Sequence, residues 1–90
     1  MDLQDEYLLD QLEALAQRLG ISVRYEMLSG EEASGAGGLC RVKGRPVVII
    51  HAQAATHVKI RILVESLKQF PLDDFYLKPA LRELLEGPAD

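Results

Sequence analysis

The segment that most constrains the fold of this chain is residues 46–70, PVVIIHAQAATHVKIRILVESLKQF. Its first part, residues 47–50, is apolar at every position, so a strand formed there has no polar face and needs cover on both sides. We expect helices on one face, and another element or a partner subunit on the other. Its second part repeats apolar residues at helical spacing until Pro71, which predicts a helix over residues 54–69.

The other elements follow from periodicity and from the positions of glycine and proline. Leucines at helical spacing begin near the N-terminus, and Gly20 suits the end of that helix. Gly44 suits a tight turn between two strands, and Pro79 suits the first position of a short helix. The predicted elements are a helix over 3–19, strands over 21–27, 39–43 and 47–50, a helix over 54–69 and a short helix from 79.

These elements predict one α+β domain over residues 1–90. We expect a three-stranded antiparallel sheet, with strand 47–50 at or near its centre, packed by two main helices and a short C-terminal helix. The connection over about 28–38 is rich in glycine and serine, which predicts a mobile loop. Its glycines match neither the lysine-containing phosphate loop nor the dinucleotide fingerprint, so we interpret them as flexible linkage.

Charge and composition exclude several kinds of partner. The net charge of −4 argues against nucleic acid, and we interpret Arg41, Lys43 and Arg45 as a charged strand edge. No apolar run approaches the roughly 20 residues that span a bilayer, and the acidic N-terminus lacks the basic start of a secretory signal. A single cysteine, Cys40, fits a reducing compartment. We therefore expect a cytoplasmic protein without a membrane or nucleic-acid partner.

Four residues are candidate metal ligands: Cys40, His51, His57 and Glu65. His51 ends the apolar strand and His57 begins the following helix, so these two side chains could approach each other. The four form no short ligand pair of the kind that marks zinc sites. We assign no catalytic residue, because neither Cys40 nor Ser66, which we expect at the surface, has a visible base beside it. A metal-dependent hydrolase with a non-standard site is an alternative hypothesis, whereas the leading expectation is no enzyme and no cofactor.

Surplus apolar residues indicate an association surface. Val58 and Ile62 lie on a second apolar face of helix 54–69, and Phe75 and Tyr76 lie in the connector 72–77. Either the connector folds back over this surface, or these four residues form an interface. We favour the interface and predict a homo-oligomer, with another protein as a further partner. A small-ligand or peptide-binding domain lined by the 28–38 loop and the central strand is the remaining alternative.

The order of elements over residues 3–70 resembles the minimal scaffold of zincin metallopeptidases, in which a strand along the substrate cleft precedes a helix carrying H-E-x-x-H. Laid over that motif, Glu65 and Gln69 replace the two histidines, and Ser66 replaces the glutamate. The resemblance therefore implies a degenerate scaffold that lacks the zinc ligands and the general base. The chain also resembles a small bacterial family with a similar GGLCRVKG turn and PALRELLEG tail, without an established activity. We expect a non-catalytic interaction or assembly module.

Overall fold

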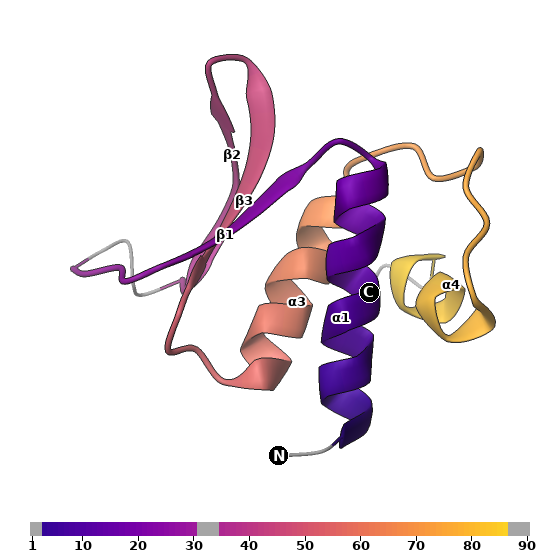
Figure 1. Ribbon diagram of the computed structural model, residues 1–90, viewed down its shortest axis with the longest axis horizontal. Helices are drawn as coiled ribbons and strands as arrows, with labels where there is room; N and C mark the ends of the chain where they lie inside the picture. The colour runs from indigo at the N-terminus through magenta and orange to yellow at the C-terminus, as the bar shows by residue number, and fades with distance from the viewer. Residues whose placement is uncertain (1–2, 31–34, 87–90) are drawn as a thin grey trace.

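The computed structural model describes residues 3–30 and 35–86, which form three helices and three strands (Figure 1). The predicted elements are all present, with ends that differ by a few residues. In chain order they are α1 (Leu3–Arg18), β1 (Ser22–Glu26), β2 (Gly37–Val42), β3 (Arg45–His51), α3 (Thr56–Leu67) and α4 (Pro79–Glu86). The α+β class predicted from the sequence is therefore confirmed. No helix in these two described ranges combines the length and apolar character needed to cross a bilayer.

The sheet is mixed, which corrects the expectation of an antiparallel sheet. Its strand order is β1-β3-β2, with β2 antiparallel to β3 and β1 parallel to β3. The central place predicted for β3 is confirmed. Because β3 takes the position between the other two strands, β1 has no contact with the strand that follows it in the sequence. Period-two alternation identifies a strand but carries no information about the direction of its neighbour, so the sequence pattern could not reveal this pairing.

The turn between β2 and β3 explains why these two strands pair as a hairpin. Lys43 and Gly44 have φ values of 53° and 82°, so both residues of this two-residue turn are left-handed. Two successive left-handed residues are typical of a turn whose twist matches that of the flanking strands. The glycine supplies one of these conformations without steric cost, as the sequence predicted, whereas Lys43 adopts the other with a β-carbon present.

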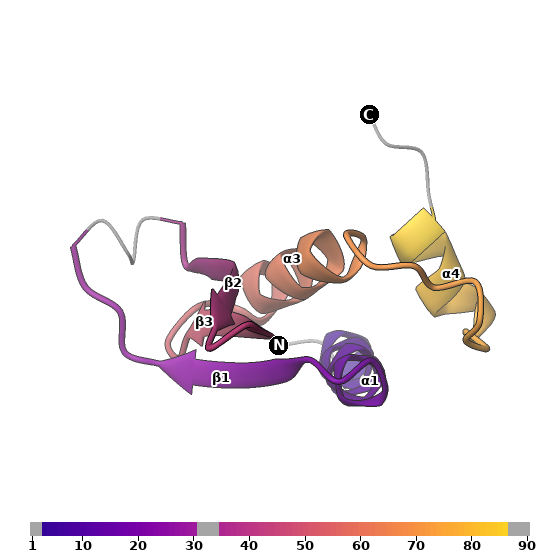
Figure 2. The same cartoon turned by 90° about the horizontal axis from the view of Figure 1, so that it is seen from above.

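Helices α1 and α3 cover one face of the sheet (Figure 2). Val48 and Ile50 point into this layer and are fully buried with Leu12 of α1 and Leu63 of α3. Residues at the alternate positions of β3, such as Val47, must point to the opposite face. Helical cover on one face was predicted and is confirmed. Among the described residues, no helix lies on the second face.

The connector between α3 and α4 folds back against the core, as one of the two sequence interpretations expected. Leu72 and Leu77 at its two ends are buried, and α4 adds Leu81 and Leu85 to the same cluster. Helix α4 packs against α1 and α3, away from the sheet. The connector and α4 therefore close the apolar layer on the side that the sheet does not reach.

Part of the glycine-rich segment is a strand. Residues 31–34 of the predicted mobile loop lie outside the described residues. Gly37 and Gly38 begin β2 and pair with Ile50 and Ile49 of β3, which corrects their interpretation as flexible linkage. A β-carbon on Gly37 would lie 1.9 Å from the carbonyl oxygen of Ile49. Glycine at this position therefore permits a close approach of two strands.

Candidate binding groove between helix α1 and strand β1

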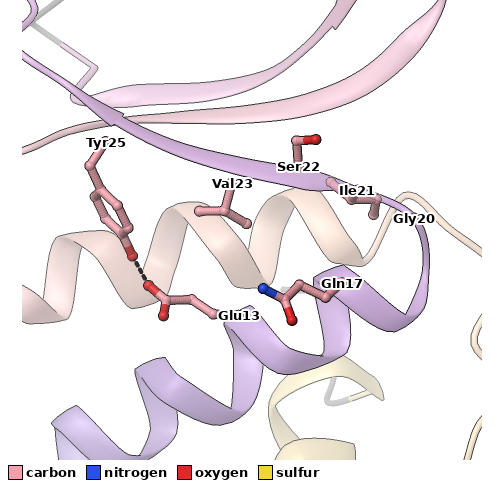
Figure 3. Close-up of a pocket in the computed structure, with 7 residues that line it drawn as sticks. All are labelled: Glu13, Gln17, Gly20, Ile21, Ser22, Val23 and Tyr25. Carbon is pink, nitrogen blue, oxygen red and sulfur yellow. Dashed lines mark hydrogen bonds between the residues drawn. The ribbon is translucent and has the colours of Figure 1, made fainter.

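A hollow lies between α1 and β1 (Figure 3). It forms because the chain reverses at Gly20, where φ is 79° and the N–H of Ile21 donates to the carbonyl of Ala16 at 2.9 Å. Strand β1 then starts beside the end of the helix and diverges from it along its length (Figure 1). The cavity is about 500 Å³, within the range of ligand-binding clefts. Its lining residues are Glu13, Gln17, Gly20, Ile21, Ser22, Val23 and Tyr25.

The outer edge of β1 carries main-chain groups that have no strand partner. The N–H of Ala52 donates to the carbonyl of Glu26 at 2.9 Å, so the main-chain groups of Glu26 point toward β3. Main-chain groups alternate in direction along a strand, so those of Arg24 also point toward β3, and those of Val23 and Tyr25 point away from it. Within residues 3–30 and 35–86, β1 pairs with β3 alone. The outward groups therefore remain open to an added strand.

The side chains at this edge combine apolar surface with a fixed polar group. Tyr25 is 39% exposed and Met27 is 65% exposed, and these are two of the large apolar residues that the fold leaves at its surface. The ammonium of Lys59, on α3, lies 5.2 Å from the centre of the Tyr25 ring. The Tyr25 hydroxyl donates a hydrogen bond to the carboxylate of Glu13 (Figure 3). This contact holds the Glu13 side chain at the wall of the groove.

The surroundings of Tyr25 favour its neutral form. Burial raises the pKa of the Tyr25 phenol above its ordinary value. The hydrogen bond to Glu13 and the negative charges of Glu13 and Asp10 raise this pKa further. The phenol therefore keeps its proton and remains a hydrogen-bond donor to Glu13 throughout the neutral pH range.

Acidic residues follow the helix wall of the groove. Glu6, Asp10, Glu13 and Gln17 are separated by four, three and four residues, a spacing that places them on one face of α1. Glu13 and Gln17 line the cavity, and Asp10 is close enough for its charge to act on Tyr25. We call Glu6, Asp10 and Glu13 the acidic stripe. Glu13 and Asp10 place negative charge on the helix side of the groove, and the Lys59 ammonium is the cation beside Tyr25.

The four candidate metal ligands do not converge. His51 is half-buried, and its Nδ1 accepts a hydrogen bond from the N–H of Leu28 at 3.3 Å. His57 and Glu65 are exposed on α3, and Cys40 lies on β2 opposite Val47. Among the described residues, which include all four candidates, no three His, Cys, Asp or Glu side chains come close enough to hold a metal ion. The two histidines are close in sequence, but His51 is half-buried beside Leu28 and His57 is exposed on α3.

Ser66 is 2% exposed, which corrects the expectation that it lies at the surface. It follows Ile62 by four residues and Leu63 by three, so it shares their buried face of α3. A serine hydroxyl enclosed in an apolar layer has no access to a substrate. This position therefore does not form a nucleophile site.

The four predicted interface residues lie in three different environments. Ile62 is 3% exposed and belongs to the core, so the second apolar face of α3 is buried within the chain at this position. Val58 is half-buried against the same core. Phe75 is half-buried, with the guanidinium of Arg18 5.5 Å from the centre of its ring, whereas Tyr76 is 73% exposed. Core packing therefore removes Ile62 from the predicted surface.

Sequence reasoning did not identify the groove, although each of its components left a signal. An aromatic residue at a strand position and carboxylates at helical spacing were both visible in the sequence. Their combination depends on β1 being an edge strand that lies beside α1, and strand order is a tertiary property. Comparison of the chain with protein-family models, with curated proteins and with solved structures finds no match. Its fold and groove define a small α+β domain with a mixed sheet and an open strand edge.

Proposed function

We propose that this chain is a non-catalytic interaction module that binds an extended polypeptide segment along the outer edge of β1. The observation that carries the proposal is the open edge of β1 beside a cavity of about 500 Å³. Peptides commonly bind exposed sheet edges by adding a strand, with main-chain hydrogen bonds for affinity and pockets for alternate side chains. The groove offers both features, since Val23 and Tyr25 present outward main-chain groups and the cavity lies beside them.

The energetics indicate which contacts must matter. Val23 and Tyr25 together offer two N–H donors and two carbonyl acceptors. At about 0.5–1.5 kcal/mol for each net hydrogen bond, the main chain supplies roughly 2–6 kcal/mol. Association costs at least about 4 kcal/mol in lost freedom of motion. Main-chain pairing alone therefore gives little affinity, and the exposed Tyr25 and Met27 side chains and the cavity must contribute the remainder.

Amide hydrogen exchange, measured residue by residue by nuclear magnetic resonance, tests the proposal. Binders are first selected from a random dodecapeptide display library, and the tightest peptide is synthesised. We expect this peptide to slow exchange at the outward amides of Val23 and Tyr25 while leaving the inward amide of Arg24 unchanged. The same peptide with a central proline is the control, because proline removes a donor from an added strand. Protection elsewhere, with β1 unchanged, contradicts strand addition at this edge.

Self-association through the second face of the sheet is a second candidate. This face carries Val47 and Ile49 from β3 and Cys40 and Val42 from β2; Val42 is 40% exposed, whereas Val47 is only 5% exposed. None of the helices in the described part of the chain covers it, which is the arrangement for which a partner subunit was predicted. Analytical ultracentrifugation of the wild type and Val42→Lys tests it. A monomer–dimer equilibrium lost in the variant supports the candidate, and a strict monomer at tens of micromolar opposes it. The predicted cytoplasmic location is compatible with either function.

A further inference from the structure

The acidic stripe on α1 identifies the chemistry of the segment that binds at β1. We propose that this segment is basic, with a lysine or arginine whose charged group meets Glu13, where Asp10 adds to the negative charge. The inference rests on the proposed function, because it assumes strand addition at the outer edge of β1. It specifies which extended polypeptides this edge accepts.

Strand geometry sends alternate side chains of an added segment toward α1. On β1 itself, Val23 and Tyr25 share a face with Val48 and Ile50, the two β3 residues in the helix-covered core. A strand added in the plane of the sheet places every second side chain on this same face. Those side chains enter the cavity between β1 and α1, where Glu13 and Gln17 form the helix wall.

The course of β1 decides which carboxylate the segment can reach. The strand starts beside the end of α1 and diverges from the helix along its length (Figure 1). Of the acidic stripe, Glu13 lines the cavity and Asp10 is close enough for its charge to act on Tyr25, whereas Glu6 lies a further turn along the helix. A long side chain with a cationic end can therefore meet Glu13, where Asp10 adds to the negative charge.

Glu13 is positioned before any segment binds. The Tyr25 hydroxyl donates to its carboxylate, and Tyr25 belongs to the strand edge that would pair with the segment. The carboxylate thus stands beside the path of the added strand. A carboxylate that accepts one hydrogen bond still has acceptor positions for a lysine or arginine.

Charge also favours pairing of the β1 edge with a basic segment over pairing with the β1 edge of a second copy of this chain. A dimer formed by pairing two β1 edges would place both α1 helices on the same face of the joined sheet. Each copy would bring its own Glu13 to the junction, and each carries a net charge of −4. Like charges brought together in this way oppose association, whereas a basic segment reverses the sign of the same interaction.

Three synthetic octapeptides test the inference. The first alternates lysine and threonine, the second glutamine and threonine, and the third glutamate and threonine, so that one face differs in charge alone. Binding is measured by fluorescence anisotropy at low and at physiological salt. We expect the lysine peptide to bind about threefold to fivefold more tightly than the glutamine peptide, from one partly exposed ion pair at Glu13, and the glutamate peptide to bind least. The lysine advantage should shrink as salt rises.

Matched charge variants locate the interaction. Glu13→Gln should weaken binding of the lysine peptide by about threefold to fivefold, the range expected for one partly exposed ion pair, without changing that of the glutamine peptide. Glu83→Gln is the control, since Glu83 is exposed on α4 and its loss changes the net charge equally. An equal effect of both variants overturns the inference, because it shows non-specific attraction to an acidic protein.

Amide exchange separates failure of the inference from failure of the proposed function. Equal affinity for the lysine and glutamine peptides, with protection of Val23 and Tyr25 by both, contradicts the basic preference and leaves strand addition intact. No protection of Val23 and Tyr25 by any of the three peptides contradicts both proposals. Protection by the lysine peptide, together with the specific effect of Glu13→Gln, supports both.

Discussion

Replacing Gly37 by alanine should destabilise the protein severely, although the residue lies in a segment that resembles a flexible loop. Its φ of 123° is rare for any residue with a β-carbon. An alanine β-carbon would also lie 1.9 Å from the Ile49 oxygen, 2.8 Å from the Ile49 carbonyl carbon and 2.9 Å from the Ile50 α-carbon. All three are main-chain atoms of the central strand, so no flexible side chain can move aside. Strand β2 must therefore shift away from β3.

The expected loss is about 3–5 kcal/mol of unfolding free energy. The unfavourable main-chain conformation costs roughly 1–3 kcal/mol. Displacing the start of β2 weakens about two hydrogen bonds at roughly 1 kcal/mol each. A domain of this size has a total stability of roughly 5–13 kcal/mol, so the variant loses a large fraction of it. At about 4–8 °C per kcal/mol, the thermal midpoint should fall by roughly 12 °C or more.

Gly38→Ala is the matched control, one residue further along the same strand. No atom lies within 4 Å of a β-carbon built there, and its φ is outside the left-handed range. Alanine restricts the unfolded chain more than glycine does, so this variant should be stabilised by about 0.5–1 kcal/mol. Urea unfolding of both variants, followed by circular dichroism, measures the difference. Equal stabilities would refute the close approach of β2 to β3 at Gly37.

Two further predictions concern individual side chains. Ile62→Ala should lower the unfolding free energy measured in a urea titration by about 2–5 kcal/mol, because Ile62 is 3% exposed. Tyr76→Ala should change it by less than about 0.5 kcal/mol, because Tyr76 is 73% exposed. Similar losses at both positions would contradict the burial of Ile62. Because the pKa of Tyr25 is raised in the folded protein, the unfolded chain releases the phenol proton first as pH rises, so this residue contributes stability that is complete below about pH 10 and declines above it. Tyr25→Phe should make stability less dependent on pH above about 10, and an unchanged alkaline profile would exclude this linkage.

Several parts of the fold could be predicted because they depend on local patterns. Helical spacing of leucines, the glycine after α1 and the proline at the start of α4 each report a local conformational preference. The central position predicted for β3 is also confirmed, since a strand that is apolar at every position suits the interior of a sheet better than its edge. The predicted antiparallel direction of β1 was wrong, because side chains alternate in the same way in parallel and antiparallel strands.

Gly37 and Ile62 show what local sequence patterns could not predict. A glycine in a polar segment indicates a flexible connection, unless another strand passes within contact distance of its α-carbon. Ile62 lies on a second apolar face of α3, which indicates either an interface or a second neighbour within the chain. In both cases the answer depended on tertiary packing, the approach of β3 to Gly37 and the burial of Ile62 in the common core.

The sequence by itself determined the α+β class, the number of elements and the burial of the 47–50 strand. It contained the carboxylates of the acidic stripe and the aromatic side chain of Tyr25, but it did not indicate that they share a groove. Only the tertiary structure decided that β1 lies at the sheet edge, parallel to β3 and beside α1. Side-chain periodicity reports which face of an element is buried, whereas strand order is set by the packing of the whole chain. The candidate binding site is a product of that packing.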